Sequence, residues 1–187
     1  CIRDRVADNT DTLKQISPTV TMGGAVKIGS DTHSTASITG VSEDYFSMKG
    51  YAVAQGRGLQ YTDVADRKKV CVVGQYLNMA YFGGNAVGQT LKIGGTTFTV
   101  VGVLEMQDTE LEEGGSDDCV YVPYSTASRL SFTGTLSNYT ITVQDTDHIS
   151  EAKALVEEKL YAIFSDDDAY TVTSMAVSYT HLRAHET

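Results

Sequence analysis

The sequence is short of positive charge, with 14 lysines and arginines against 24 aspartates and glutamates and a formal net charge of −10. Nucleic-acid binding needs clustered cations that neutralise phosphates. The longest run of adjacent basic residues is Arg67-Lys68-Lys69, which is too short for that purpose. The composition therefore predicts no nucleic-acid partner.

Long apolar runs are also missing. No stretch approaches the about 18 consecutive apolar residues that a membrane-spanning helix requires, and no basic start followed by an apolar segment marks a signal peptide. The chain opens on Cys1, and we expect it to be a segment of a longer protein. Residues 177–187 continue no pattern, and we interpret them as a non-native tail that takes no part in the fold.

Residue patterns typical of catalysis or metal binding are scarce. His33 and His148 are isolated, which favours surface or turn positions for both. His181 and His185 have the i, i+4 spacing of a zinc pair, but they lie in the suspected tail. No serine lies in a G-x-S-x-G elbow, and no cysteine has a base beside it. The sequence therefore predicts neither a hydrolytic triad nor a metal centre.

Two cysteines lie inside strand-like apolar runs. Cys71 follows Val70, and Cys119 precedes Val120. A buried cysteine in such a run behaves as a small hydrophobic residue. A disulfide between them requires neighbouring strands with suitable Cβ positions, and the sequence leaves this pairing open.

The most suggestive glycine motif runs from Gly83 to Thr90 and differs from the phosphate-binding pattern G-x-x-x-x-G-K-[ST] in having Gln89 in place of the lysine. A phosphate loop follows a strand and opens a helix, whose amides hold the anion. Here a helix is expected before the loop and a strand after it. We therefore predict a glycine-rich connection with positive φ angles, and no nucleotide cofactor.

The hydrophobic pattern predicts an α+β fold. The expected helix at 75–82 directs Tyr76, Met79, Ala80 and Phe82 inward, and Pro18 ends the first expected helix. The expected elements are helices at 1–16, 75–82 and 149–164, a short helix that starts at 42–46, a short helical turn at 125–130, hairpins formed by 19–28 with 34–41 and by 91–93 with 96–104, and strands at 69–73, 120–122, 136–143 and 169–176.

The segment 105–118 is rich in carboxylates and contains no lysine or arginine. Neither this segment nor the cluster at 166–168 has the ligand rhythm of a calcium loop. A solvated, mobile loop is one interpretation. The alternatives are a weak divalent-ion site or a contact surface for a basic partner, for which the candidate residues are Glu110, Glu112, Glu113, Asp117 and Asp118.

Short blocks in a fixed order cover residues 36–130. They read GVSEDYF at 40–46, GR at 56–57, KVCVVG at 69–74, AYFG at 80–83, VGQTLKIG at 87–94, FTVVGVL at 98–104 and YVP at 121–123, with Asp63 and Thr126 between or after them. In order and spacing this series resembles the extracytoplasmic core domain of MacB-like ABC transporter permeases, the MacB/FtsX superfamily. The glycine loop is part of that pattern.

The resemblance implies a mixed α/β lobe built from residues 1–35 and 135–176, with a small strand-rich lobe of residues 36–134 inserted into it. It implies a domain tethered outside the cytoplasmic membrane, between the first two membrane helices of a permease subunit, with no catalytic residues and no cofactor. The implied partners are those membrane helices, a second permease subunit, a separate cytoplasmic ATP-binding domain, and an envelope adaptor or substrate.

The function expected from the resemblance is non-enzymatic: the domain couples ATP-driven motion of membrane helices to substrate export or to an envelope partner. Two other classes of function stay open from the residues alone. The first is a secreted or surface module for ligand binding or adhesion, and the second is a hydrolase.

Overall fold

The chain divides into two compact units in the computed structural model, which describes residues 13–131, 138–143, 146–164 and 171–173. The strand-rich unit comprises residues 15–141, and the terminal unit comprises 1–14 with 142–187. The expected lobes had boundaries at residues 35 and 134. The strand-rich unit is larger than the expected inserted lobe, because strands before residue 36 pair with strands of the middle section.

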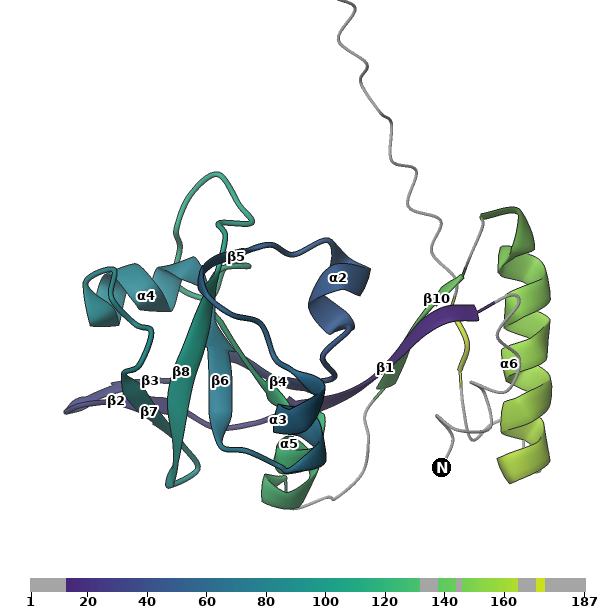
Figure 1. Cartoon of the computed structure of the whole chain (residues 1–187), viewed down its shortest axis with the longest axis horizontal. Coiled ribbons are helices and arrows are strands. Elements are labelled where there is room, and N and C mark those ends of the chain that lie inside the picture. Colours follow the sequence, from purple (N-terminus) through teal and green to yellow (C-terminus); the bar gives the residue numbers. More distant parts are fainter. Residues whose placement is uncertain (1–12, 132–137, 144–145, 165–170, 174–187) are drawn as a thin grey trace, which may run out of the picture. The chain divides into compact units, whose positions relative to one another are not determined.

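The described strands form one mixed ten-stranded sheet (Figure 1). Its strands are β1 Leu13–Met22, β2 Val26–Ile28, β3 Asp31–His33, β4 Ser37–Val41, β5 Val53–Gly56, β6 Val70–Val73, β7 Thr90–Ile93, β8 Thr96–Leu104, β9 Cys119–Pro123 and β10 Asn138–Val143. They are ordered β10-β1-β4-β9-β6-β8-β7-β2-β3, and β5 pairs with β8. The pairs β4–β9 and β6–β8 are parallel, so the fold is α+β with a mixed sheet, as predicted.

Four short helices belong to the strand-rich unit: α2 Tyr45–Lys49, α3 Tyr61–Ala65, α4 Gln75–Phe82 and α5 Tyr124–Leu130. The terminal unit contains a 3-10 turn, η1 Thr146–His148, and the long helix α6 Ile149–Phe164, on which Ala152 and Val156 are buried. The bounds predicted for α4 and α6 are confirmed. No helix among the described residues is long and apolar enough to cross a membrane.

The central strands β6 and β9 are buried on both faces. Cys71 and Val73 belong to one hydrophobic cluster, and Val72 between them belongs to a second cluster on the other face. Along β9, Cys119 packs in the second cluster and Val120 in the first. The two cysteines therefore face opposite sides of the sheet, and both are free and buried. This arrangement answers the open question of their pairing.

The N-terminal expectation was wrong. Residues 1–12 lie outside the described part, but the chain from Leu13 to Met22 is a strand that passes through Pro18, where we expected the end of a helix. The β1–β4 pairing begins only at Val20, so the missing N–H of Pro18 interrupts none of its hydrogen bonds. The alignment Val20↔Gly40 encloses a smaller hairpin, β2–β3.

Two predictions based on glycine are confirmed. The β7–β8 hairpin turns at Gly94 and Gly95, whose φ angles of 54° and 82° suit a type I′ turn. Helix α4 ends at Gly83 with φ 57°, and the glycine loop leads from that helix into β7. The expected last strand, 169–176, is not seen at residues 171–173, which have no regular structure; its other residues and the tail lie outside the described ranges.

The inward face predicted for α4 is confirmed for Tyr76 and Phe82, which pack against the hydrophobic core, but it was wrong for Met79 and Ala80, which are exposed. Leu77 and Asn78 are its buried residues, whereas 52% of Met79 is exposed. Asn78 is fixed because its Oδ1 accepts a hydrogen bond from the Ala86 amide at 3.1 Å, which ties the helix to the following loop. Met79 lies about 100° further around the helix than Asn78 and is on its solvent side.

Candidate functional site

The acidic loop, residues 105–118, is held at its base by two buried carboxylates. Asp117 is about 1% exposed, and its oxygens accept hydrogen bonds from the amide of Gln107 at 3.1 Å and from the amide of Asp108 at 3.1 Å. Its carbonyl accepts a bond from the Tyr76 amide at 3.2 Å, at the start of α4. Asp117 therefore joins the beginning and the end of the loop to each other and to a helix.

Asp118, which is itself buried, is the centre of a second set of hydrogen bonds. Both of its carboxylate oxygens lie 2.8 Å from His33 Nε2, and Oδ2 also accepts bonds from Thr35 Oγ1 and the Gly114 amide, each at 2.8 Å. Because a carboxylate can only accept, the proton of the imidazole lies on Nε2. The contact links β3 to a loop 85 residues away in sequence.

Tyr81 completes this network from α4. Its hydroxyl lies 2.9 Å from His33 Nδ1, and in the neutral ring this nitrogen accepts the phenolic proton. The two rings also pack, with centroids 5.1 Å apart. We call the set Tyr81, His33, Thr35 and Asp118 the polar brace, since it ties a helix, a strand and the acidic loop together.

A carboxylate, an imidazole and a hydroxyl in series is also the arrangement that activates a nucleophile. In the brace the hydroxyl is a phenol, and loss of solvation, together with Tyr76 and the carboxylates of Glu113 and Asp118, raises its pKa. That shift keeps Tyr81 protonated, which is the opposite of activation. The imidazole and the carboxylate are themselves almost inaccessible, at 3% and 1% exposed. We interpret the brace as a support for the loop.

Only part of the predicted contact surface is available to a partner. Glu110, Glu112 and Glu113 are exposed, but Asp117 and Asp118 are buried in the hydrogen bonds just described. Including those two in a partner surface was therefore wrong. The physical reason is their position directly before β9, a strand buried on both faces, where side chains turn inward with the strand.

His33 was also predicted wrongly, since it is a buried member of the brace and neither a surface nor a turn residue. No sequence pattern marks it as buried; the structure shows it as the last residue of β3, whose first two residues are exposed and whose third is buried. His148 is exposed and lies 3.1 Å from Glu151, while His181 and His185 are outside the described residues. Among the described residues, no group of three or more His, Cys, Asp or Glu could hold a metal ion.

Exposed apolar side chains lie at the same end of the strand-rich unit as the acidic loop. Met79 projects from α4, and Met106 lies in the loop itself, 44% exposed. The Gln55 side chain on β5 donates to the Gly84 carbonyl at 3.3 Å, which brings that strand to the end of α4. This end therefore combines flexible methionine side chains with three exposed carboxylates on a loop whose base is fixed, and one of the three, Glu113, accepts a hydrogen bond from Thr35 Oγ1 at 3.2 Å.

Comparison with known proteins gives one consistent result. A family model described as the MacB-like periplasmic core domain matches residues 2–159. Curated relatives are named macrolide export ATP-binding/permease protein MacB. The protein from Paracoccus denitrificans is 32% identical over 90% of this chain and 25% of its own length, and that from Acinetobacter baylyi is 28% identical over 88% and 25%. The chain thus spans about a quarter of these relatives.

Solved structures agree on the fold. The periplasmic region of MacB from Actinobacillus actinomycetemcomitans superposes with a TM-score of 0.74 at 23% identity, covering 88% of this chain and 73% of that one. The extracellular domain of the ABC-type transporter YknZ from Gram-positive bacteria gives a TM-score of 0.77 at 19% identity, covering 92% and 87%.

Proposed function

The chain belongs to the family of MacB-like periplasmic core domains, and on this premise we propose that it couples ATP-driven motion of membrane helices to substrate export or to an envelope partner. This family is a periplasmic domain of transporter permeases and not an enzymatic fold. The observation that carries the proposal is the family match over residues 2–159, which spans both units.

The proposed partners follow from the relatives, whose names combine an ATP-binding part with a permease. We assign ATP hydrolysis to a separate cytoplasmic domain, and we place this chain outside the cytoplasmic membrane, beside the membrane helices of its parent protein. A second permease subunit completes the proposed assembly. We extend the export role to this chain without assigning macrolides as its substrate.

The acidic loop is the proposed contact for an adaptor or another envelope protein with a basic surface. A loop that transmits force must keep its shape under load, and the buried bonds of Asp117 and Asp118 support such rigidity. Glu110, Glu112 and Glu113 stay exposed beyond that fixed base. Because all three side chains are negatively charged, they attract a basic partner and repel a second copy of the same loop.

The test uses the full parent transporter. Replacement of Glu110, Glu112 and Glu113 by glutamine should reduce export while protein level and ATP hydrolysis are kept. Glu158→Gln, at an exposed carboxylate on α6, is the control and should leave export unchanged. Unchanged export after the triple replacement would remove the loop from the proposal. Unchanged export after deletion of the whole domain would refute the coupling role itself.

A further inference from the structure

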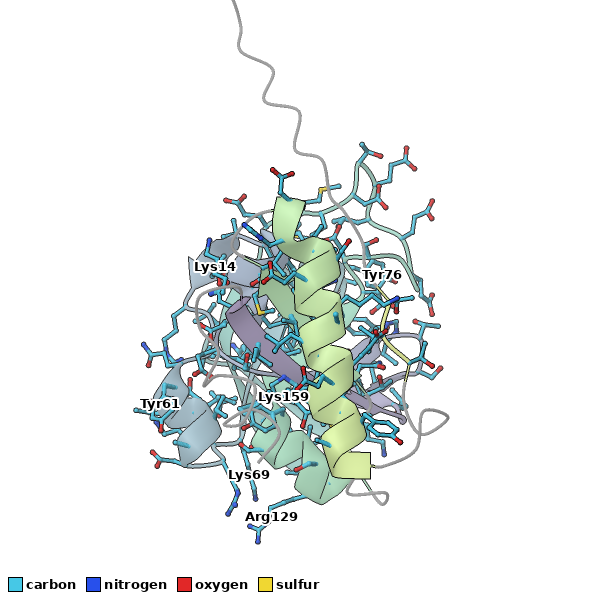
Figure 2. The ribbon with its side chains drawn as sticks, turned by 90° about the vertical axis from the view of Figure 1, so that its right-hand side faces the viewer. Lys14, Tyr61, Lys69, Tyr76, Arg129 and Lys159 are labelled. Atoms are coloured by element: carbon cyan, nitrogen blue, oxygen red, sulfur yellow. The ribbon has the colours of Figure 1, made fainter. Side chains whose placement is uncertain are left out.

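A basic surface lies at the other end of the strand-rich unit. It comprises Arg67, Lys68 and Lys69 in the loop between α3 and β6, and Arg129 in the last turn of α5; we call it the basic end. All four are exposed. Figure 2 shows Lys69 and Arg129 pointing outward at the same end as Tyr61, the first residue of α3.

The basic end is one surface because its elements are bonded together. Thr126 on α5 donates to the Lys68 carbonyl at 3.0 Å, and Ser125 donates to the Val64 carbonyl on α3. The Thr99 amide on β8 donates to the Lys69 carbonyl at 3.0 Å. The loop backbone is therefore fixed on both sides, while its charged side chains project into solvent.

Three of the four cations have no carboxylate partner among the described residues. Lys68 lies 3.8 Å from Asp66 and 3.4 Å from Asp63, and Arg57 lies 2.6 Å from Asp63, so these charges compensate one another. Arg67, Lys69 and Arg129 form no ion pair with any described residue. An uncompensated positive surface thus stands on a chain whose net charge is −10.

Arg67 occupies a position where glycine is the usual choice. It follows α3 and has a φ of 52°. Among the residues that the structure describes, no other residue except glycine has a positive φ. Its amide donates to Val64 O at 3.3 Å, and the Lys68 amide donates to Asp63 O at 2.9 Å. These two bonds define a Schellman motif, whose left-handed residue is normally glycine because a Cβ there is strained. An arginine that accepts this strain points to a role for its side chain.

We propose that the basic end binds the anionic lipid headgroups of the membrane beside which the domain stands. The inference rests on the proposed function, since it requires a membrane within reach. Tyr61 is 65% exposed at this end, and an exposed aromatic ring among cations is typical of membrane–water interfaces. The cations come from one loop and from α5, and Lys69 and Arg129 point outward (Figure 2), which suits a flat charged surface more than a single carboxylate.

The test is binding of the 187-residue chain to phosphatidylcholine vesicles with and without phosphatidylglycerol, measured by flotation. Binding should require phosphatidylglycerol and should weaken between about 0.1 M and about 1 M salt, where the screening length falls from about 10 Å to about 3 Å. Each cation removed from the basic end should weaken partitioning about fivefold, the usual effect of one basic residue near an anionic surface.

The decisive variant is Arg67→Gly combined with Arg129→Gln. Glycine relieves the backbone strain, so the variant should fold normally while its vesicle binding falls about 25-fold. The matched control is Lys27→Gln combined with Lys92→Gln, which removes two exposed lysines from β2 and β7 and should leave binding within about twofold of the unmodified chain. Thermal unfolding of each variant separates lost binding from lost structure.

Equal loss in the control and the decisive variant would overturn the proposal, as would binding that does not depend on phosphatidylglycerol. Retention on immobilised polyglutamate without vesicle binding would also overturn it and would assign the surface to an acidic protein. The outcome is separable from the coupling role. If export requires the domain but the domain does not bind vesicles, only the lipid-binding inference is refuted. If the domain binds vesicles but export does not require it, only the coupling role is refuted.

Discussion

Removal of the Asp118 carboxylate should destabilise the strand-rich unit strongly. The carboxylate accepts bonds from His33 Nε2, Thr35 Oγ1 and the Gly114 amide, each at 2.8 Å. His33 and Asp118 are both buried, so solvent does not screen their interaction. Loss of the carboxylate leaves the buried His33 Nε2–H without an acceptor, which costs about 1–3 kcal/mol, and removes the bonds from Thr35 and Gly114, which contribute about 1 kcal/mol each. Asp118→Ala should therefore lower the free energy of unfolding by about 3–5 kcal/mol.

The assay is chemical and thermal unfolding followed by hydrogen exchange. In a chain of this size about 1 kcal/mol shifts Tm by about 2–4 °C, so the expected decrease is about 6–20 °C. The Gly114 amide should exchange much faster in the variant, whereas the Val72 amide in the core strand β6 should lose protection only in proportion to global stability. Glu113→Gln, at an exposed carboxylate beside the brace, is the control and should change stability by less than about 0.5 kcal/mol.

A loss below about 1 kcal/mol for Asp118→Ala would refute the reasoning, since it would mean that the hydrogen bonds to Asp118 contribute no more than one ordinary bond. A double-mutant cycle with His33→Phe then separates the pair from its surroundings. The cycle should give a coupling energy of about 0.5–3 kcal/mol. A coupling near zero would place the effect in the Thr35 and Gly114 contacts and would remove His33 from the brace.

Three further predictions concern single sites. Lys27 and Lys92 are directly opposite on β2 and β7, so Lys27→Glu should raise the free energy of unfolding by about 0.2–1 kcal/mol in urea titrations; no gain at low salt would contradict this. Burial raises the pKa of Asp63, but hydrogen bonds from Arg57 and neighbouring groups outweigh it and hold that pKa below its usual range. The Asp63 carboxylate therefore stabilises the fold above about pH 4, and this contribution is lost as pH falls through the lowered pKa. Asp63→Asn should make the free energy of unfolding depend less on pH in the acidic range. An unchanged pH dependence there would refute this. Burial raises the pKa of Cys119 to about 12, so its thiol should resist alkylation in the folded chain and react in denaturant. Rapid alkylation of Cys119 in the native protein, detected by mass spectrometry, would refute that.

Local signals predicted the elements that depend on neighbouring residues. Glycines at 83 and 94–95 marked the end of α4 and the β7–β8 turn because those positions require positive φ angles. The regular spacing of apolar residues gave α6 in the same way. Each of these features is determined within one or two turns of chain, where propensity and turn chemistry dominate.

Long-range pairing decided the features that the sequence did not predict. The strand at Leu13–Met22 forms in part because β1 aligns with β4, and its own apolar spacing indicated a helix only loosely. The brace joins His33 to Asp118 across 85 residues, and no local pattern distinguishes Asp118 from the other carboxylates of the acidic loop. Asp118 is buried because it directly precedes β9, whereas the exposed carboxylates lie further along the loop. The burial of β9 exists only in the assembled sheet.

The distribution of charge follows from the same central strands. Because β6 and β9 are buried on both faces, charged side chains are excluded from their length and gather beyond their ends. The antiparallel β6–β9 pair puts the start of β6 and the end of β9, with the basic loop and α5, at one end, and the acidic loop at the other. When two copies of the chain approach each other with the same end, their like charges repel, whereas each end attracts a surface of opposite charge. The two ends of the strand-rich unit are therefore suited to different partners: a basic protein at the acidic loop and an anionic surface at the basic end.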